Sequence, residues 1–107
     1  MTASESAFEA VVVRLLEEPG TDLATTFRSP GVRLNGKIVA MHVRGHLVVK
    51  LPAERCAEVV ATGAGRPFES GRRVMREWVT IEGVDADAWV AYAEEALAFA
   101  QAAAASG

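Results

Sequence analysis

The stretch LNGKIVAMHVRGHLVVKLP, residues 34–52, constrains the fold more than any other part of this 107-residue chain. Short runs of aliphatic and β-branched residues are separated by the dipeptides Asn35-Gly36 and Arg44-Gly45. Asn-Gly is the strongest two-residue signal for a β-hairpin, because both positions of a type I′ turn need a positive φ. The stretch therefore predicts a β-meander that begins with the run GVRL just before it.

Two-residue turns would determine the pairing of these strands. The expected pairs are Val43 with His46, Met41 with Val48, Val39 with Lys50, Leu34 with Lys37 and Val32 with Val39. One face would then carry Val32, Leu34, Val39, Met41, Val43 and Val48, and the other Ile38, Ala40, Leu47, Val49 and Leu51 together with His42. Both faces are apolar, so helices on one side would leave the second face to be covered by another helix, a partner subunit or a ligand.

Helical and strand patterns flank the meander. Residues 4–18 read as an amphipathic helix, with a capping box from Thr2 and Glu5 or from Ser6 and Glu9. Residues 21–31 read as a loop, 52–63 as a helix that begins at Pro52, 66–69 as a short edge strand and 74–83 as a strand. Asp85 should cap a last helix over residues 86–104, and residues from about 102 to 107 should fray. The expected order is α-β-β-β-α-(β)-β-α, a single α+β domain over residues 1–107.

Charge is divided unevenly along the chain, whose overall net charge is −3. Residues 28–76 hold ten basic and three acidic residues, a net +7, while the rest of the chain has a net −10. This division is typical of an anion-binding face, or of acidic helices that pack beside a basic sheet within one molecule or across a dimer. We favour the second interpretation.

No apolar run approaches the roughly 20 residues of a membrane helix, and the acidic start MTASESAFEA does not resemble a signal peptide. We therefore expect a cytoplasmic protein with no membrane partner. The single cysteine, Cys56, lies at an apolar helical position and should be a buried structural thiol. His42 and His46 have the spacing of a helical zinc pair, but on strands they would point to opposite faces, so we expect no metal site and no cofactor.

Glu77 interrupts the apolar stripe of VMREWVTI that Met75, Val79 and Ile81 form. A carboxylate in such a stripe needs a partner, and Arg33 and His42 are the candidates for a buried polar network. A structural ion pair is the favoured interpretation, and a general acid or base with a raised pKa is the alternative. The sequence contains no recognisable catalytic set and no glycine loop of the kind that binds phosphates.

The segment GRPFESGRRVMRE carries the best candidates for nucleic-acid binding, because arginine forks suit phosphate. These candidates are Arg66, Arg72, Arg73 and Arg76, with Phe68 among them. Arginines are equally common on solvated hairpins, and no helix-turn-helix is evident.

The meander, the helix that ends in ATGAGRPFE, the strand GRRVMREWVTI and the helix WVAYAEEALAFA together resemble the TfoX N-terminal domain family (TfoX/Sxy-like proteins), over roughly residues 8–101. The related YjbR-like proteins show a similar order of elements. The resemblance implies a fold like that of type III secretion chaperones, a two-layer α/β sandwich with an antiparallel sheet in the order α-β3-α-β2-α. It implies a bacterial protein linked to transcription regulation, although the C-terminal domain of the full-length competence regulators has no counterpart here. The family offers no catalytic residues to transfer.

Three functions remain open. The favoured one is a non-enzymatic regulatory or adaptor domain that acts through protein contacts, as a homodimer or with a protein partner. The second is a nucleic-acid binder that uses the segment from Arg66 to Arg76. The third is a small-molecule binder or enzyme with a pocket near Glu77, His42 and Trp78.

Overall fold

Both turns of the meander form in the computed structural model, which describes residues 1–26 and 28–106. Asn35 and Gly36 have φ angles of 51° and 85°, and Arg44 and Gly45 have φ angles of 52° and 82°. Positive φ at both central positions is the mark of the type I′ turn, whose twist matches that of the strands it joins. The two turns therefore place three consecutive strands side by side.

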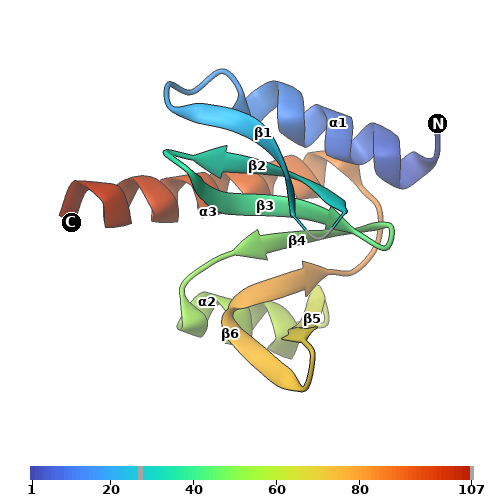
Figure 1. The fold of residues 1–107 in the computed structure, drawn as a ribbon. Coiled ribbons are helices and arrows are strands. Elements are labelled where there is room, and N and C mark those ends of the chain that lie inside the picture. Colours follow the sequence, from blue (N-terminus) through green and yellow to red (C-terminus); the bar gives the residue numbers. More distant parts are fainter. Residues whose placement is uncertain (27, 107) are drawn as a thin grey trace.

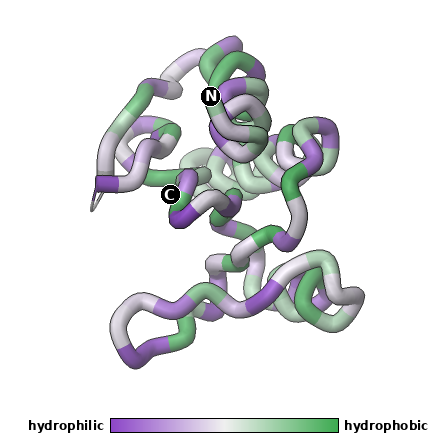
Figure 2. The backbone as a smooth tube through the Cα atoms, turned by 90° about the vertical axis from the view of Figure 1, so that its right-hand side faces the viewer, coloured by the Kyte–Doolittle hydropathy of each residue, from purple (hydrophilic) through white to green (hydrophobic). Residues whose placement is uncertain are grey.

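The described residues form an antiparallel six-stranded sheet with three helices against one face (Figures 1 and 2). The elements are α1 (Ala3–Leu15), β1 (Thr21–Thr26), β2 (Ser29–Leu34), β3 (Lys37–Val43), β4 (His46–Lys50), α2 (Ala53–Ala61), β5 (Gly65–Ser70), β6 (Arg73–Ile81) and α3 (Ala86–Ser106). The strands lie in the order β1-β2-β3-β4-β6-β5. The predicted α+β fold, a two-layer sandwich on an antiparallel sheet, is confirmed.

The sheet has one strand more than expected, because the predicted loop at residues 21–31 contains β1. Its six residues pair with β2 in an unbroken register from Thr21 opposite Leu34 to Thr26 opposite Ser29. Thr, Leu and Ala alternate weakly here, and Leu23 remains 57% exposed, so the segment lacks the apolar alternation by which a strand is recognised. The order of elements is therefore α-β4-α-β2-α.

A β-bulge in β3 changes which residues face the helices. Val32 lies opposite Ala40 and Arg33 opposite Ile38, so Val39 is the extra residue and the predicted pair of Val32 with Val39 is wrong. Because side chains alternate along a strand, one extra residue exchanges the faces of β2 relative to the far part of β3. The predicted pairs of β3 with β4, Val43 with His46 and Met41 with Val48, are confirmed. The helix-facing core of the meander consequently contains Val32, Leu34, Val39, Ala40, Leu47, Val49 and Leu51.

The helices end close to their predicted limits and pack as amphipathic elements. The capping box of α1 uses Thr2 and Glu5, whose carboxylate accepts a hydrogen bond from Thr2 N at 2.7 Å. Asp85 caps α3 through a 2.9 Å hydrogen bond from Asp87 N. The side chain of Trp89, fully buried, lies at the centre of the core with Leu15 of α1. The alanine-rich tail, predicted to fray from about residue 102, remains helical through Ser106, and Gly107 lies outside the described residues.

None of the described helices is both long enough and apolar enough to span a membrane.

Candidate binding surface on the helix-free face

A second, larger bulge gives the β5–β6 hairpin its shape. Pro67 lies opposite Val79 and Phe68 opposite Met75, so residues 76–78 of β6 have no counterpart in β5. Three extra residues bend the strand and increase its twist. We call the part of the hairpin beyond this bulge, residues 68–75, the arm. In Figure 2 the hairpin turns away from the body of the sheet on the side opposite the helices.

Between the arm and the meander the helix-free face is hollowed. The cavity measures about 520 Å³, and we call it the hollow. Its apolar lining comes from the middle strands and the hairpin and consists of Ile38, Met41, Val43, Phe68, Met75 and Trp78. The polar residues that also line it are Arg28, Ser29, Arg44 and Ser70. Phe68 and Trp78 lie with their ring centroids 6.4 Å apart at 53°, a tilted aromatic pair.

The strands beneath the hollow are apolar although no helix covers them. Met41 is 8% exposed and Val48 is 1% exposed, yet neither belongs to the helix-facing core. Thr80, opposite Val48 in the sheet, is also buried. The prediction of a second apolar sheet face is therefore confirmed for the middle strands, and the curled hairpin supplies part of the cover.

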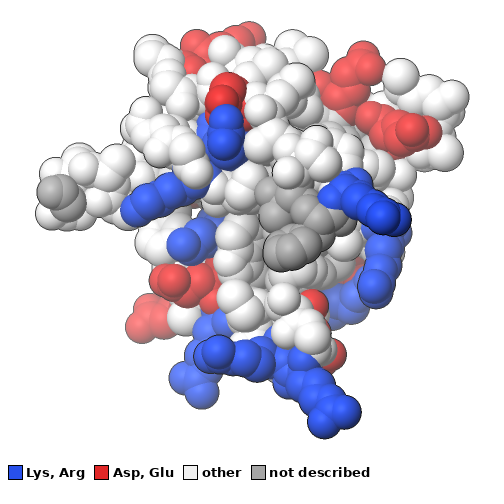
Figure 3. All heavy atoms as spheres, in the orientation of Figure 1, with Lys and Arg blue, Asp and Glu red and all other residues white. Residues whose placement is uncertain are grey.

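Many basic side chains around this face lack an intramolecular partner. Among the described residues, no carboxylate oxygen lies within 4.0 Å of the charged groups of Arg28, Lys37, Arg44, Lys50, Arg72, Arg73 or Arg76. Several carboxylates are instead engaged elsewhere, for example Glu95 of α3 with Arg55 of α2 at 2.8 Å. Figure 3, which views the helix-free face, shows Lys and Arg side chains along both sides and the lower margin. The surface combines apolar cavities with unpaired positive charge.

The four arginines proposed for nucleic-acid binding are not equivalent in the structure. Arg66 is bound to Glu82 at 2.7 Å, so its charge is already partnered. Arg72, Arg73 and Arg76 are exposed. Arg73 and Arg76 line a further cavity of about 380 Å³ together with Lys50 and Trp78.

The predicted polar network of Glu77, His42 and Arg33 does not form. Glu77 lies within the bulge of β6, where the strand alternation is broken, and its side chain is exposed. Arg33 instead binds Asp22 of β1, with Nε 3.0 Å from Oδ1, and this contact lowers the pKa of the Asp22 carboxyl. A pocket shared by Glu77, His42 and Trp78 is equally absent from the described residues, because His42 lies among the helices.

His42 is part of the helix-facing layer rather than of the hollow. Its ring stacks on Phe8 at 5.3 Å between centroids and lies 6.1 Å from the ring of Trp89. Its Nε2 is 3.1 Å from Ser4 Oγ, and burial lowers the pKa of the imidazole. His46, expected to be solvated, is half-buried, and its Nδ1 has no hydrogen-bond partner among the described residues.

Cys56 is buried, as predicted. Its thiol lies 3.5 Å from Leu51 O, to which it donates, and burial raises the thiol pKa. Within residues 1–26 and 28–106, no three His, Cys, Asp or Glu side chains cluster closely enough to hold a metal ion.

The arginines were predictable from the sequence, but the hollow was not. The hollow depends on Phe68 and Trp78 coming together on the helix-free side, and the three residues 76–78 that have no counterpart in β5 make that possible. The signal available in the sequence was Pro67, which cannot donate to a ladder and often marks an edge strand or a bulge.

No protein-family model matches this chain, and no curated protein is significantly similar to it in sequence.

Proposed function

We propose that this chain is a non-enzymatic adaptor domain that binds a protein segment in the hollow of its helix-free face. The observation that carries the proposal is an apolar cavity of about 520 Å³ bordered by the unpaired cations Arg28 and Arg44. Apolar pockets that accept one or two anchoring side chains are typical of protein-binding surfaces, and charges at the rim select the partner and raise the association rate. The resemblance to TfoX N-terminal domains supports a regulatory role in the bacterial cytoplasm.

The chemistry of the partner follows from the same surface. A cavity with Ile38, Met41 and Trp78 in its wall suits a bulky aliphatic or aromatic side chain. The basic rim favours acidic residues on either side of that anchor, because unlike charges across an interface attract. The expected partner is therefore an acidic segment with an apolar anchor.

A displayed library of random 12-residue peptides tests this proposal. Selection against the wild-type protein should enrich peptides in which an apolar residue is flanked by Asp or Glu. Ile38→Glu should weaken the selected peptides at least tenfold, since the loss of a buried anchor contact costs more than about 1.4 kcal/mol. Arg44→Glu should weaken the same peptides and reduce the salt dependence of their binding.

Leu23→Glu is the matched control, because Leu23 is an exposed aliphatic residue of the same sheet, on β1, that does not line the hollow. It should bind the peptides as the wild type does. Enrichment of no acidic, apolar motif, or equal binding by Ile38→Glu, would contradict the proposal.

A second candidate, binding of single-stranded nucleic acid, is favoured by one specific observation. The cavity of about 380 Å³ places Trp78 beside the cations Lys50, Arg73 and Arg76. Aromatic rings that stack on bases and cations that follow the phosphates are the usual elements of such sites. Fluorescein-labelled dT20 at low salt tests it: binding should quench tryptophan fluorescence, fall steeply with salt and weaken in Arg73→Glu/Arg76→Glu. Absence of an anisotropy change at 20 mM salt would exclude it.

A further inference from the structure

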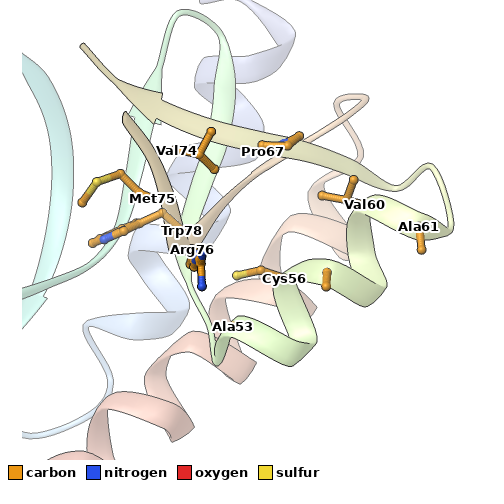
Figure 4. Close-up of a pocket in the computed structure, with 10 residues that line it drawn as sticks. Ala53, Cys56, Val60, Ala61, Pro67, Val74, Met75, Arg76 and Trp78 are labelled. Carbon is orange, nitrogen blue, oxygen red and sulfur yellow. The ribbon is translucent and has the colours of Figure 1, made fainter. Parts of the chain in front are cut away.

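A second apolar groove lies between α2 and the strands β5 and β6 (Figure 4), and it shares only Met75 and Trp78 with the lining of the hollow. Its volume is about 390 Å³. One wall is formed by Ala57, Val60 and Ala61 of α2, and the facing wall by Pro67 and Val74. Val74 is 56% exposed, one of the few large aliphatic side chains that the described chain leaves so open.

The small residues of α2 explain why this groove is not filled from within. Residues 53, 56, 57, 60 and 61 recur at helical spacing and line the groove, while Val59 on the adjacent stripe enters the core together with the buried Cys56. A helix with a second, small-residue stripe leaves a shallow apolar channel beside it.

The two banks of the groove carry opposite charges. On α2, Glu54 and Glu58 are exposed and one helical turn apart, next in sequence to the groove-lining Ala53 and Ala57, so they flank the groove without lining it. Glu58 Oε1 lies 3.3 Å from Arg55, and Glu54 has no ion pair among the described residues. On β6, Arg76 lines the groove, and the adjoining cavity around Val74 is lined by Lys50, Arg73 and Arg76 with one carboxylate, Glu77, so this bank is basic on balance.

The arm itself carries one acidic side chain, Glu69, which lies opposite Val74 in the β5–β6 pairing. With Arg72 and Arg73, the charge of the arm is still basic on balance.

We infer that this groove is the interface between two copies of the chain related by a twofold axis. A twofold interface brings one surface patch against itself, so it needs a patch that complements itself. An apolar floor with an acidic bank on one side and a basic bank on the other meets that requirement. The acidic bank of each copy faces the basic bank of the other, and the exposed Val74 side chains enter the apolar groove across the axis. The inference rests on α2 and Val74, which do not line the hollow, so it does not depend on the partner proposed there.

Exchange of charges between the banks tests the arrangement by sedimentation equilibrium. One variant, Glu54→Arg/Glu58→Arg, has two basic banks, and the other, Arg73→Glu/Arg76→Glu, has two acidic banks. Each alone should associate at least tenfold more weakly than the wild type, because like charges then face one another. An equimolar mixture of the two should recover association as a heterodimer, since every acidic bank again meets a basic one.

The wild-type protein should form dimers at roughly 10 to 200 µM, a range in which small interfaces associate, and the association should weaken as salt rises. Val74→Asp should abolish it, whereas Val13→Asp, an exposed valine on the outer side of α1, should leave it unchanged. Far-UV circular dichroism of each variant reports the fold independently. A wild-type protein that is monomeric at 200 µM, variants that dimerise as the wild type does, or a mixture that stays monomeric would each overturn the inference.

Discussion

The packing of Gly65 at the base of the hairpin makes a quantitative prediction possible. A Cβ atom at this position would lie 2.7 Å from Thr80 O and 2.7 Å from Val59 Cγ1, and 3.1 Å from Val79 Cγ2. Carbon atoms ordinarily pack at about 3.5 to 4.0 Å, so β5 would have to retreat by several tenths of an ångström from both β6 and α2. Val59 and Thr80 are buried and have little room to move.

Gly65→Ala should therefore reduce the free energy of unfolding by about 2 kcal/mol, within the range found for overpacked sites. In a chain of 107 residues this corresponds to a decrease in Tm of about 8 °C. Urea unfolding followed by circular dichroism measures it as a lower midpoint with an unchanged slope.

A double-mutant cycle with Val59→Ala identifies the cause. Val59→Ala alone should cost about 2 kcal/mol through the lost methyl groups and the cavity. Because it also removes one of the two clashing atoms, the double variant should lose at least about 0.5 kcal/mol less than the sum. Gly63→Ala is the control: Gly63 has a φ of +83° with open space around it, so its cost arises from the backbone and should be additive with Val59→Ala. A Gly65→Ala protein within about 0.5 kcal/mol of the wild type would refute the steric argument.

Three further predictions concern single side chains. Arg44 occupies a left-handed turn position with φ of 52°, which asparagine adopts more readily than arginine. Arg44→Asn should therefore raise the urea midpoint by the equivalent of about 0.5 kcal/mol, and it should weaken the binding of the peptides selected for the hollow. A lower midpoint would contradict this reasoning. Burial lowers the pKa of the His42 imidazole, with Glu5 acting in the opposite sense and His46 in the same sense. As pH falls, the imidazole of the unfolded chain is therefore protonated before that of the folded chain, and the free energy of unfolding should decline below about pH 6.5. His42→Gln should have a flatter profile of urea midpoint against pH, and equal slopes would count against the assignment. The raised pKa of the Cys56 thiol predicts slow reaction with a disulfide reagent in the native state and rapid reaction in 6 M urea, and fast native labelling would disagree.

Local signals in the sequence sufficed where one residue type decides the backbone. Asn35-Gly36 and Arg44-Gly45 produced the expected type I′ turns, and Asp85 produced the expected cap. The α+β class followed from the order of these elements.

The errors arose where the tertiary structure overrode strand alternation. The extra residue Val39 shifted β2 by one position relative to β3, and the bulge at residues 76–78 moved Glu77 from the predicted apolar stripe to the surface. A bulge depends on how a whole sheet twists and closes on its helices, so alternation within one strand does not reveal it. The candidate site was affected most, because the hollow and the fate of Glu77 both depend on the β6 bulge.

The β6 bulge also separates the hairpin from the register of the sheet. Trp78, Val79 and Thr80 remain paired with β4, and on the outer side of the bulge the arm pairs only with itself. The turn at the tip is built on Gly71, with φ of +65° and open space around it. Insertions or exchanges of two or four residues at that tip would therefore lengthen or replace the arm without moving any core strand. Replacement of this one hairpin could therefore change the proposed binding surface without changing the rest of the sheet, and the same position is suited to the grafting of foreign recognition loops.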